Sequence, residues 1–172
     1  MSSSFPPTGT ELTTERLVLR PWVTDEIDAV LDDGRMAHWA EDFPAEGDRV
    51  IAGFITEWTG TPGAYGHRLI VERESGLVVG STSLLWPPTD GALEVGYGIV
   101  ASRRGRGYAS EAARALIGFA LRMPGVHTVY ADVELANPAS VRVLEKAGLR
   151  RWSEDGTTAR FRTEAAPGLP ER

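Results

Sequence analysis

The sequence contains no cysteine among its 172 residues. This absence excludes disulfides, thiolate metal sites and a cysteine nucleophile. No apolar run is long enough to span a membrane, and the first residues lack the charged and apolar regions of a signal peptide. We therefore expect a cytoplasmic protein with no membrane partner.

An excess of basic charge is also lacking, because the formal net charge is −6. A nucleic-acid binder presents a basic face, so we expect no nucleic-acid partner. The histidines His38, His67 and His127 have no metal-ligand spacing, and we expect no metal site. A local basic cluster nevertheless fits a small anionic ligand better than a polyanion. Its members are Arg103, Arg104, Arg106 and Arg114.

The length and a hydrophobic content of 42% suit one compact domain. We expect a flexible leader over residues 1–10, a single domain over 11–164 and a flexible tail over 165–172. Both ends are rich in residues that disfavour regular structure.

Hydrophobic periodicity predicts alternating strands and helices. Helices are expected at 24–32 (with Thr24 as its cap), 48–59, 107–122 and 139–147. Strands are expected at 12–20, 65–73, 78–86, 92–100, 128–134, around Trp152 and at 159–162, with turns at 60–63 and 87–91. This order predicts an α+β fold with a mostly antiparallel sheet.

A glycine-rich turn near the middle of the chain is the most informative segment. The apolar run 96–100 leads into Gly105 and Gly107, and a helical pattern starts at once. Such a turn directs free backbone N–H groups at one spot, which suits a phosphate or pyrophosphate. The alternative is a simple strand–helix turn. The arginines favour the anion site, because they would otherwise repel each other and the positive end of the helix.

Two common phosphate-binding patterns do not fit this turn. A P-loop requires Lys and then Ser or Thr after its last glycine, whereas Tyr108 and Ala109 follow here. The dinucleotide-binding pattern of glycines is present only in a broken form.

Three blocks of sequence resemble the GNAT superfamily of N-acetyltransferases. Arg104-Gly105-Arg106-Gly107-Tyr108-Ala109 is similar to its R-x-x-G-x-A signature for acetyl-CoA. The stretch from Asn137 to Leu149 resembles a block of the ribosomal-protein N-acetyltransferase-like (RimJ/RimL-like) branch, and 14–21 resembles a block near its start. The blocks occur in family order and cover about 12–162. The resemblance implies a mixed, mostly antiparallel sheet that is splayed between its fourth and fifth strands, with flanking helices.

The same resemblance implies acetyl-CoA as the co-substrate. The backbones of Tyr97, Gly98 and Ile99 would bond to its pantetheine arm, and Asn137 and Ser140 would face the thiol end. The turn would hold the pyrophosphate through Arg104, Gly105, Arg106, Gly107, Tyr108, Ala109 and Ser110.

An amine would attack the thioester directly in a ternary complex, which requires a base and benefits from an acid. Asp132 matches the position of a fifth-strand base in one branch of the family but is one methylene shorter, and Glu94 on the fourth strand is the alternative base. Relatives protonate the thiolate with a tyrosine at the position that Leu144 occupies here, so Ser140 is the remaining candidate acid.

The acceptor is expected to be a primary amine, either a protein N-terminus or a small molecule. Trp39, Glu41, Asp42 and Phe43 would line its approach, unless they form a solvated acidic loop over a core tryptophan. The alternative function is a non-catalytic acyl-CoA-binding or sensor module. The family resemblance also allows a homodimer.

Overall fold

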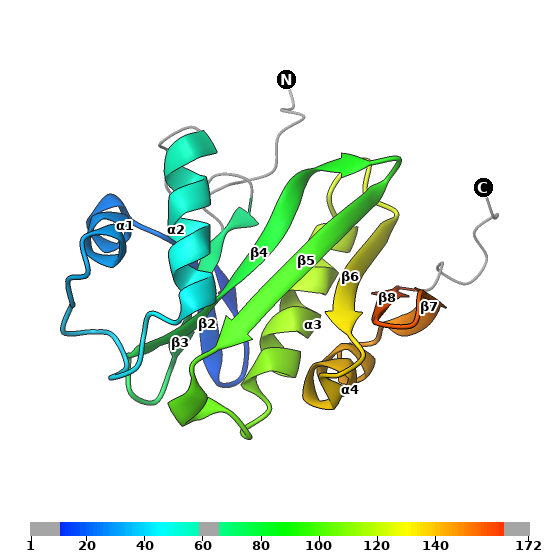
Figure 1. Cartoon of the computed structure of the whole chain (residues 1–172). Coiled ribbons are helices and arrows are strands. Elements are labelled where there is room, and N and C mark those ends of the chain that lie inside the picture. The colour runs from blue at the N-terminus through cyan, green and yellow to red at the C-terminus, as the bar shows by residue number, and fades with distance from the viewer. Residues whose placement is uncertain (1–10, 59–65, 164–172) are drawn as a thin grey trace.

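The computed structural model describes residues 11–58 and 66–163, which form one mixed sheet with helices on both faces (Figure 1). The described part of the sheet has eight strands in the order β1-β2-β3-β4-β5-β6-β8-β7. Every neighbouring pair is antiparallel except β5 and β6, which are parallel. The strands are β1 (Leu12–Thr13), β2 (Leu17–Pro21), β3 (Arg68–Glu72), β4 (Val78–Thr89), β5 (Ala92–Ile99), β6 (Thr128–Glu134), β7 (Arg150–Glu154) and β8 (Thr158–Arg162).

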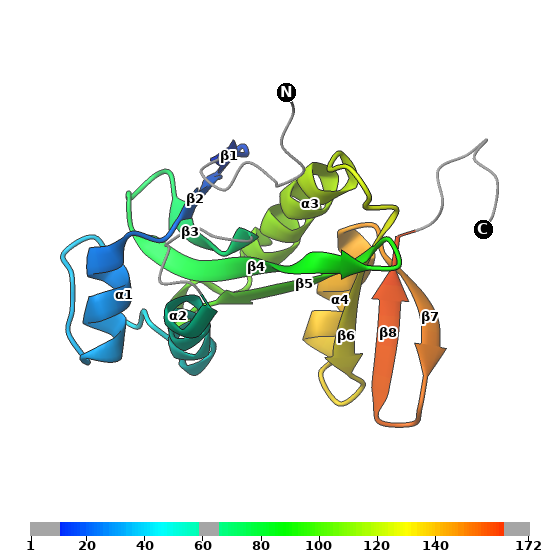
Figure 2. The same ribbon diagram turned by 90° about the horizontal axis from the view of Figure 1, so that it is seen from above.

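The helices are α1 (Thr24–Leu31), α2 (Glu46–Trp58), α3 (Tyr108–Leu121) and α4 (Pro138–Lys146), with a short 3-10 turn η2 (Ala101–Arg103) before α3. Figure 2 shows α2 and α3 on opposite faces of β4 and β5. No helix within the described ranges is long and apolar enough to cross a bilayer.

Two faces of the sheet follow from strand alternation. Leu93 and Val95 of β5 pack in one buried cluster with α3 and α4. The intervening residue Glu94 therefore points to the other face, which we call the α2 face, because Ser81 on it bonds to Asp48 of α2. On β6, Val129 and Ala131 are likewise buried under α3, which leaves Tyr130 and Asp132 on the α2 face.

The sheet opens between β5 and β6. Their pairing covers Ala92–Thr128, Leu93–Val129 and Glu94–Tyr130 and then stops. Figure 1 shows the two ribbons diverging from there toward the C-terminal ends of both strands. The predicted α+β fold and its splay between the expected fourth and fifth strands are confirmed.

Three local predictions were wrong. The expected strand over 12–20 is two short strands, because Thr14 and Arg16 turn aside to bond with Glu111 of α3. Thr24 does not cap α1, since the cap is Val23, whose N–H donates to Glu26 Oε1 at 3.1 Å. The turn expected at 87–91 is shorter, because β4 continues to Thr89 and only Asp90 and Gly91 reverse the chain with positive φ.

The other elements differ from their predicted bounds by a few residues at most, and β6 matches its prediction. The expected leader, the turn at 60–63 and the tail lie outside the described residues.

Candidate active site

The glycine turn presents a run of free donors. Gly105 and Gly107 have φ of +81° and +83°, a conformation that favours glycine. None of the backbone N–H groups from Gly105 to Ser110 has a hydrogen-bond acceptor among the described residues. Because α3 begins at Tyr108, its positive end adds to these donors, and the turn can bind an anion.

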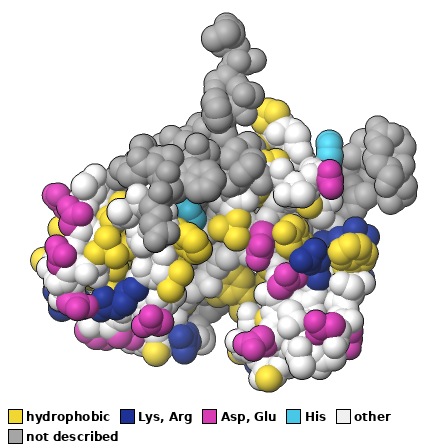
Figure 3. All heavy atoms as spheres, turned by 45° about the horizontal axis from the view of Figure 1, so that its top comes forward, with side chains coloured by type: hydrophobic (Ala, Val, Ile, Leu, Met, Phe, Trp, Pro, Cys, Tyr) yellow, Lys and Arg dark blue, Asp and Glu magenta, His cyan; other side chains and the backbone are white. Residues whose placement is uncertain are grey.

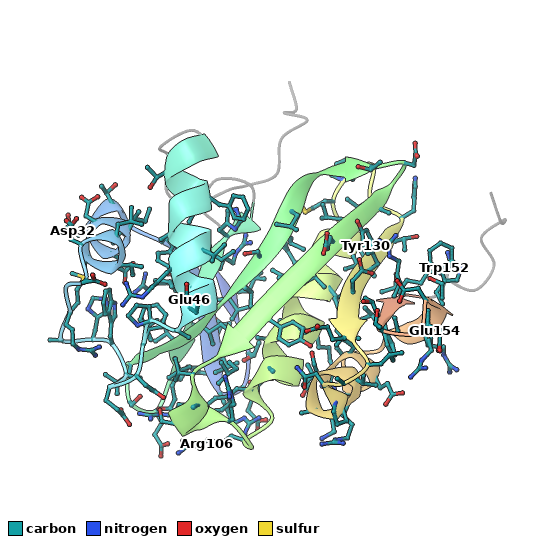
Figure 4. All side chains as sticks on the ribbon, viewed as in Figure 1. Asp32, Glu46, Arg106, Tyr130, Trp152 and Glu154 are labelled. Atoms are coloured by element: carbon teal, nitrogen blue, oxygen red, sulfur yellow. The ribbon has the colours of Figure 1, made fainter. Side chains whose placement is uncertain are left out.

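The arginines of the turn are already bonded within the protein (Figure 4 labels Arg106). Arg106 and Arg103 contact the two carboxylate oxygens of Glu72, at 3.1 and 3.5 Å. Arg104 Nε donates to the carbonyl of Ile99 at 3.0 Å, which ties the turn to the end of β5. Glu72 thus reduces the repulsion among the arginines, which the sequence suggested an anion would relieve. The free backbone N–H groups are the better indication of an anion site.

A second network fixes the start of α3. Glu111 accepts bonds from Thr14 Oγ1 at 2.5 Å, from the Arg16 N–H at 2.9 Å and from Arg16 Nε at 2.7 Å. Arg16 also donates to the carbonyl of Arg106 at 2.8 Å. The turn is therefore held from the β1–β2 side as well as from β3.

The predicted pantetheine strand has a free edge. Beyond Glu94, β5 keeps β4 as a partner but has none on its β6 side among the described strands. On the β4 side there is no room for a side chain at Gly80, because a Cβ added there would lie 2.1 Å from the carbonyl oxygen of Gly98. The edge that contains Tyr97, Gly98 and Ile99 can therefore bond to an extended ligand as a further strand would.

The opening is bridged by a pair of hydroxyl groups. Asn137 caps α4 by accepting the N–H of Ser140 at 3.3 Å, and Ser140 Oγ lies 2.9 Å from the hydroxyl of Tyr97 on β5. Leu144, one turn further along α4, is buried. The family resemblance implied a role for the backbone of Tyr97 alone; its side chain could not be paired with Ser140 from the sequence, because 43 residues separate the two.

The two candidate bases lie on the α2 face, where the strands begin to splay. Burial, and then the charge of Asp132, raises the pKa of Glu94 above its usual value. Asp132 itself accepts two bonds from Arg160, at 2.8 and 3.0 Å. The two carboxylates thus differ: Asp132 is ion-paired with an arginine, whereas the pKa of Glu94 lies above its usual value.

A neutral histidine lies directly before β3, next to this site. His67 Nδ1 is 2.9 Å from Ser83 Oγ, and Ser83 pairs with Gly96 on the α2 face. Burial, with a smaller effect from Arg68, lowers the pKa of His67 to about 4. Within the described ranges no three His, Cys, Asp or Glu side chains could hold a metal ion together.

The segment expected to receive the acceptor has a different role. Trp39 and Phe43 are core residues, 3% and 1% exposed, with ring centroids 5.1 Å apart. Asp42 accepts bonds from the N–H and hydroxyl of Ser102, and Glu41 lies 3.5 Å from Arg103. Of the two alternatives, the acidic loop over a core tryptophan is therefore the one that fits, because the acids bond to the η2 turn and the aromatics fill the core beneath α2.

Comparison with known proteins agrees with this arrangement. The chain matches the family model described as "Acetyltransferase (GNAT) domain" over residues 16–150. The uncharacterized N-acetyltransferase YjdG of Bacillus subtilis (strain 168) is 37% identical over 81 residues, which are 46% of this chain and 48% of that protein. The chain thus matches about half the length of this curated relative.

Solved structures share the fold. A GNAT-family acetyltransferase from Bacillus anthracis has a TM-score of 0.66 and 22% identity, covering 89% of this chain and 97% of that one. An acetyltransferase from Agrobacterium tumefaciens str. C58 has a TM-score of 0.63 and 24% identity, covering 95% and 97%. The family match spans the glycine turn, the splayed strands and the α4 cap, and the chain belongs to the GNAT acetyltransferase family.

Proposed function

We propose that this protein transfers the acetyl group of acetyl-CoA to a primary amine in a ternary complex. Acetyl transfer to an amine is the general reaction of its family. The main support for this proposal is that the free N–H groups of 105–110 adjoin the free edge of β5. The pyrophosphate would bind at the turn, and the pantetheine arm would extend along β5 toward Glu94.

Glu94 is the proposed base. Free amines have pKa values of roughly 8 to 10, so the attacking nitrogen must lose a proton. A carboxylate with a raised pKa accepts that proton more readily than one held in an ion pair. Asp132 is then a positioning residue: its charge raises the pKa of Glu94, and the Arg160 that it holds lowers that pKa by a smaller amount.

The pair of Tyr97 and Ser140 is the proposed proton source for the leaving group. As the amine nitrogen bonds to the carbonyl carbon, the C–S bond breaks and the thiolate takes a proton. Burial raises the pKa of Tyr97, which therefore stays protonated at neutral pH. Its hydroxyl can donate to Ser140 Oγ, and Ser140 can donate onward to sulfur, which substitutes for the tyrosine that Leu144 replaces.

The decisive experiment measures free-thiol release from acetyl-CoA with a broad panel of amines. We expect turnover with at least one amine and a loss of about a hundredfold or more in kcat for Glu94→Gln. Asp132→Asn should lower turnover less and shift the acidic limb of the pH profile. Acetyl-CoA binding without turnover across the panel would instead support the acyl-CoA sensor.

Two further expectations are independent of this chemistry. A homodimer stays a prediction for sedimentation analysis, and a cytoplasmic location stays one for fractionation.

A further inference from the structure

A row of side chains crosses three strands at the closed end of the splay. Glu94 pairs with Tyr130 across β5 and β6, and Tyr130 pairs with Arg162 across β6 and β8. Directly paired residues share a face, so all three point to the α2 face. Two strand spacings separate the backbones of Glu94 and Arg162 by about 10 Å.

Arg162 differs from two other arginines of the same hairpin. Arg160 is paired with Asp132, and Arg151 with Glu154 at 2.7 Å. Arg162 makes no ion pair with an acid in the part of the chain that the structure describes. A guanidinium with no acidic partner within the described ranges, in a protein of net charge −6, is available for an anion from solution.

Trp152 holds this guanidinium in place. The Arg162 guanidinium carbon lies 4.3 Å from the centroid of the Trp152 ring, which is on the neighbouring strand and 53% exposed. Figure 4 shows Trp152 on β7 and Tyr130 on β6. In Figure 3, basic and hydrophobic side chains lie together over the C-terminal hairpin, with acidic ones nearer the middle of the molecule. Stacking fixes the plane of a guanidinium and leaves its N–H groups at the edge free to donate.

We propose that Arg162, stacked on Trp152, binds a carboxylate of the acceptor whose amine lies at Glu94. This inference rests on the proposed acetyl transfer. The row has opposite charges at its two ends, so it complements a molecule with an ammonium at one end and a carboxylate several bonds away. A guanidinium matches a carboxylate with two parallel hydrogen bonds. The acceptor class is therefore an ω-amino acid or a short peptide with a free C-terminus, and a polyamine is disfavoured by Arg162.

The test compares amines that differ only in the anionic group. The pairs are 6-aminohexanoate with 6-aminohexanamide, and triglycine with its C-terminal amide. We expect kcat/KM to be about three- to tenfold higher for each carboxylate, through KM with little change in kcat. Hexanoate, which lacks the amine, should compete with 6-aminohexanoate.

Arg162→Gln should abolish the preference and weaken hexanoate inhibition by the same factor, while acetyl-CoA affinity by calorimetry stays unchanged. Arg151→Gln is the matched control, because Arg151 stacks over Phe161 and pairs with it on the other face of the same hairpin. It should keep the full preference.

Equal kcat/KM within both pairs, or a preference that survives Arg162→Gln, would overturn this subsite and leave acetyl transfer standing. Failure of every amine to release thiol would instead count against the proposed function.

Discussion

At the scale of single residues, the hydroxyl groups of Tyr97 and Ser140 are the proposed proton source for the leaving thiolate. Tyr97→Phe removes one hydroxyl and keeps the ring that packs beside the α3 cluster. We expect kcat with acetyl-CoA to fall by about a hundredfold, since general acid catalysis contributes on that order. The measurement is turnover with acetyl donors whose thiols differ in pKa, and the loss should shrink as the thiol becomes more acidic.

Ser140→Ala provides the check on this pair. If the two hydroxyls act in series, the double variant should be little slower than either single variant. Equal losses for all thiols would show that Tyr97 does not protonate the leaving group.

His67 makes stability depend on pH. Its pKa is about 4 in the folded protein and near 6.5 when unfolded, so the unfolded chain binds more protons between these values. The stabilisation is complete above pH 6.5 and is lost as pH falls toward 4, which amounts to about 2 kcal/mol between pH 7.5 and pH 5. Chemical denaturation at the two pH values should show this loss reduced by about 2 kcal/mol in His67→Asn. His127→Asn, at an exposed histidine, should leave the loss as in wild type.

The residue types of the site could be predicted, but their contacts could not. Gly105 and Gly107 are marked by their spacing and by the helix that follows. No local pattern indicates that Glu72 neutralises Arg103 and Arg106, because these partners are more than 30 residues apart. The pairing of Tyr97 with Ser140 likewise depends on the distance between a strand and a helix.

At the level of elements, β4 and β5 leave no room for a side chain at Gly80. Gly80→Ala would place a methyl group against the carbonyl of Gly98, and the two strands would have to separate. We expect a loss of about 1–3 kcal/mol in the free energy of unfolding, together with weaker acetyl-CoA binding. Denaturant unfolding and calorimetry measure the two effects.

Gly96→Ala is the control on the partner strand, since nothing lies within 4 Å of its added Cβ. Its stability should change by no more than about 0.5 kcal/mol. Equal losses in the two variants would mean that general strand propensity, and not this contact, is responsible.

Periodicity predicted the long elements best. The alternation of β6 and the apolar stripe of α3 specify their elements locally, because one face of each is buried. The break at Thr14–Arg16 could not be predicted in this way, since it depends on the carboxylate of Glu111. The splay itself was inferred from family resemblance and not from any pattern of residues.

At the scale of the whole molecule, the described core consists of two buried clusters that meet along α3. One gathers α1, α2 and β2 to β4 with the end of β5, and the other gathers α3, β6, α4 and β8. A ligand between β5 and β6 would contact residues from both. Acetyl-CoA at a hundred times its Kd should add about 2.7 kcal/mol of stability, which raises the melting temperature by about 5 to 10 °C.

Thermal denaturation by circular dichroism measures this shift. ADP, which lacks the pantetheine arm, should give a smaller one at the same multiple of acetyl-CoA's Kd. An unchanged melting temperature at millimolar acetyl-CoA would contradict the proposed slot.

The bonding of the arginines in the glycine turn also bears on how tightly a phosphate would bind. Long side chains lose conformational entropy when a ligand immobilises them, by about 0.5–1.5 kcal/mol each. Arg103, Arg104 and Arg106 are already restrained by Glu72 and by the carbonyl of Ile99. Much of that entropy is lost when the protein folds, so a pyrophosphate at the proposed site would immobilise these side chains at a smaller entropic cost.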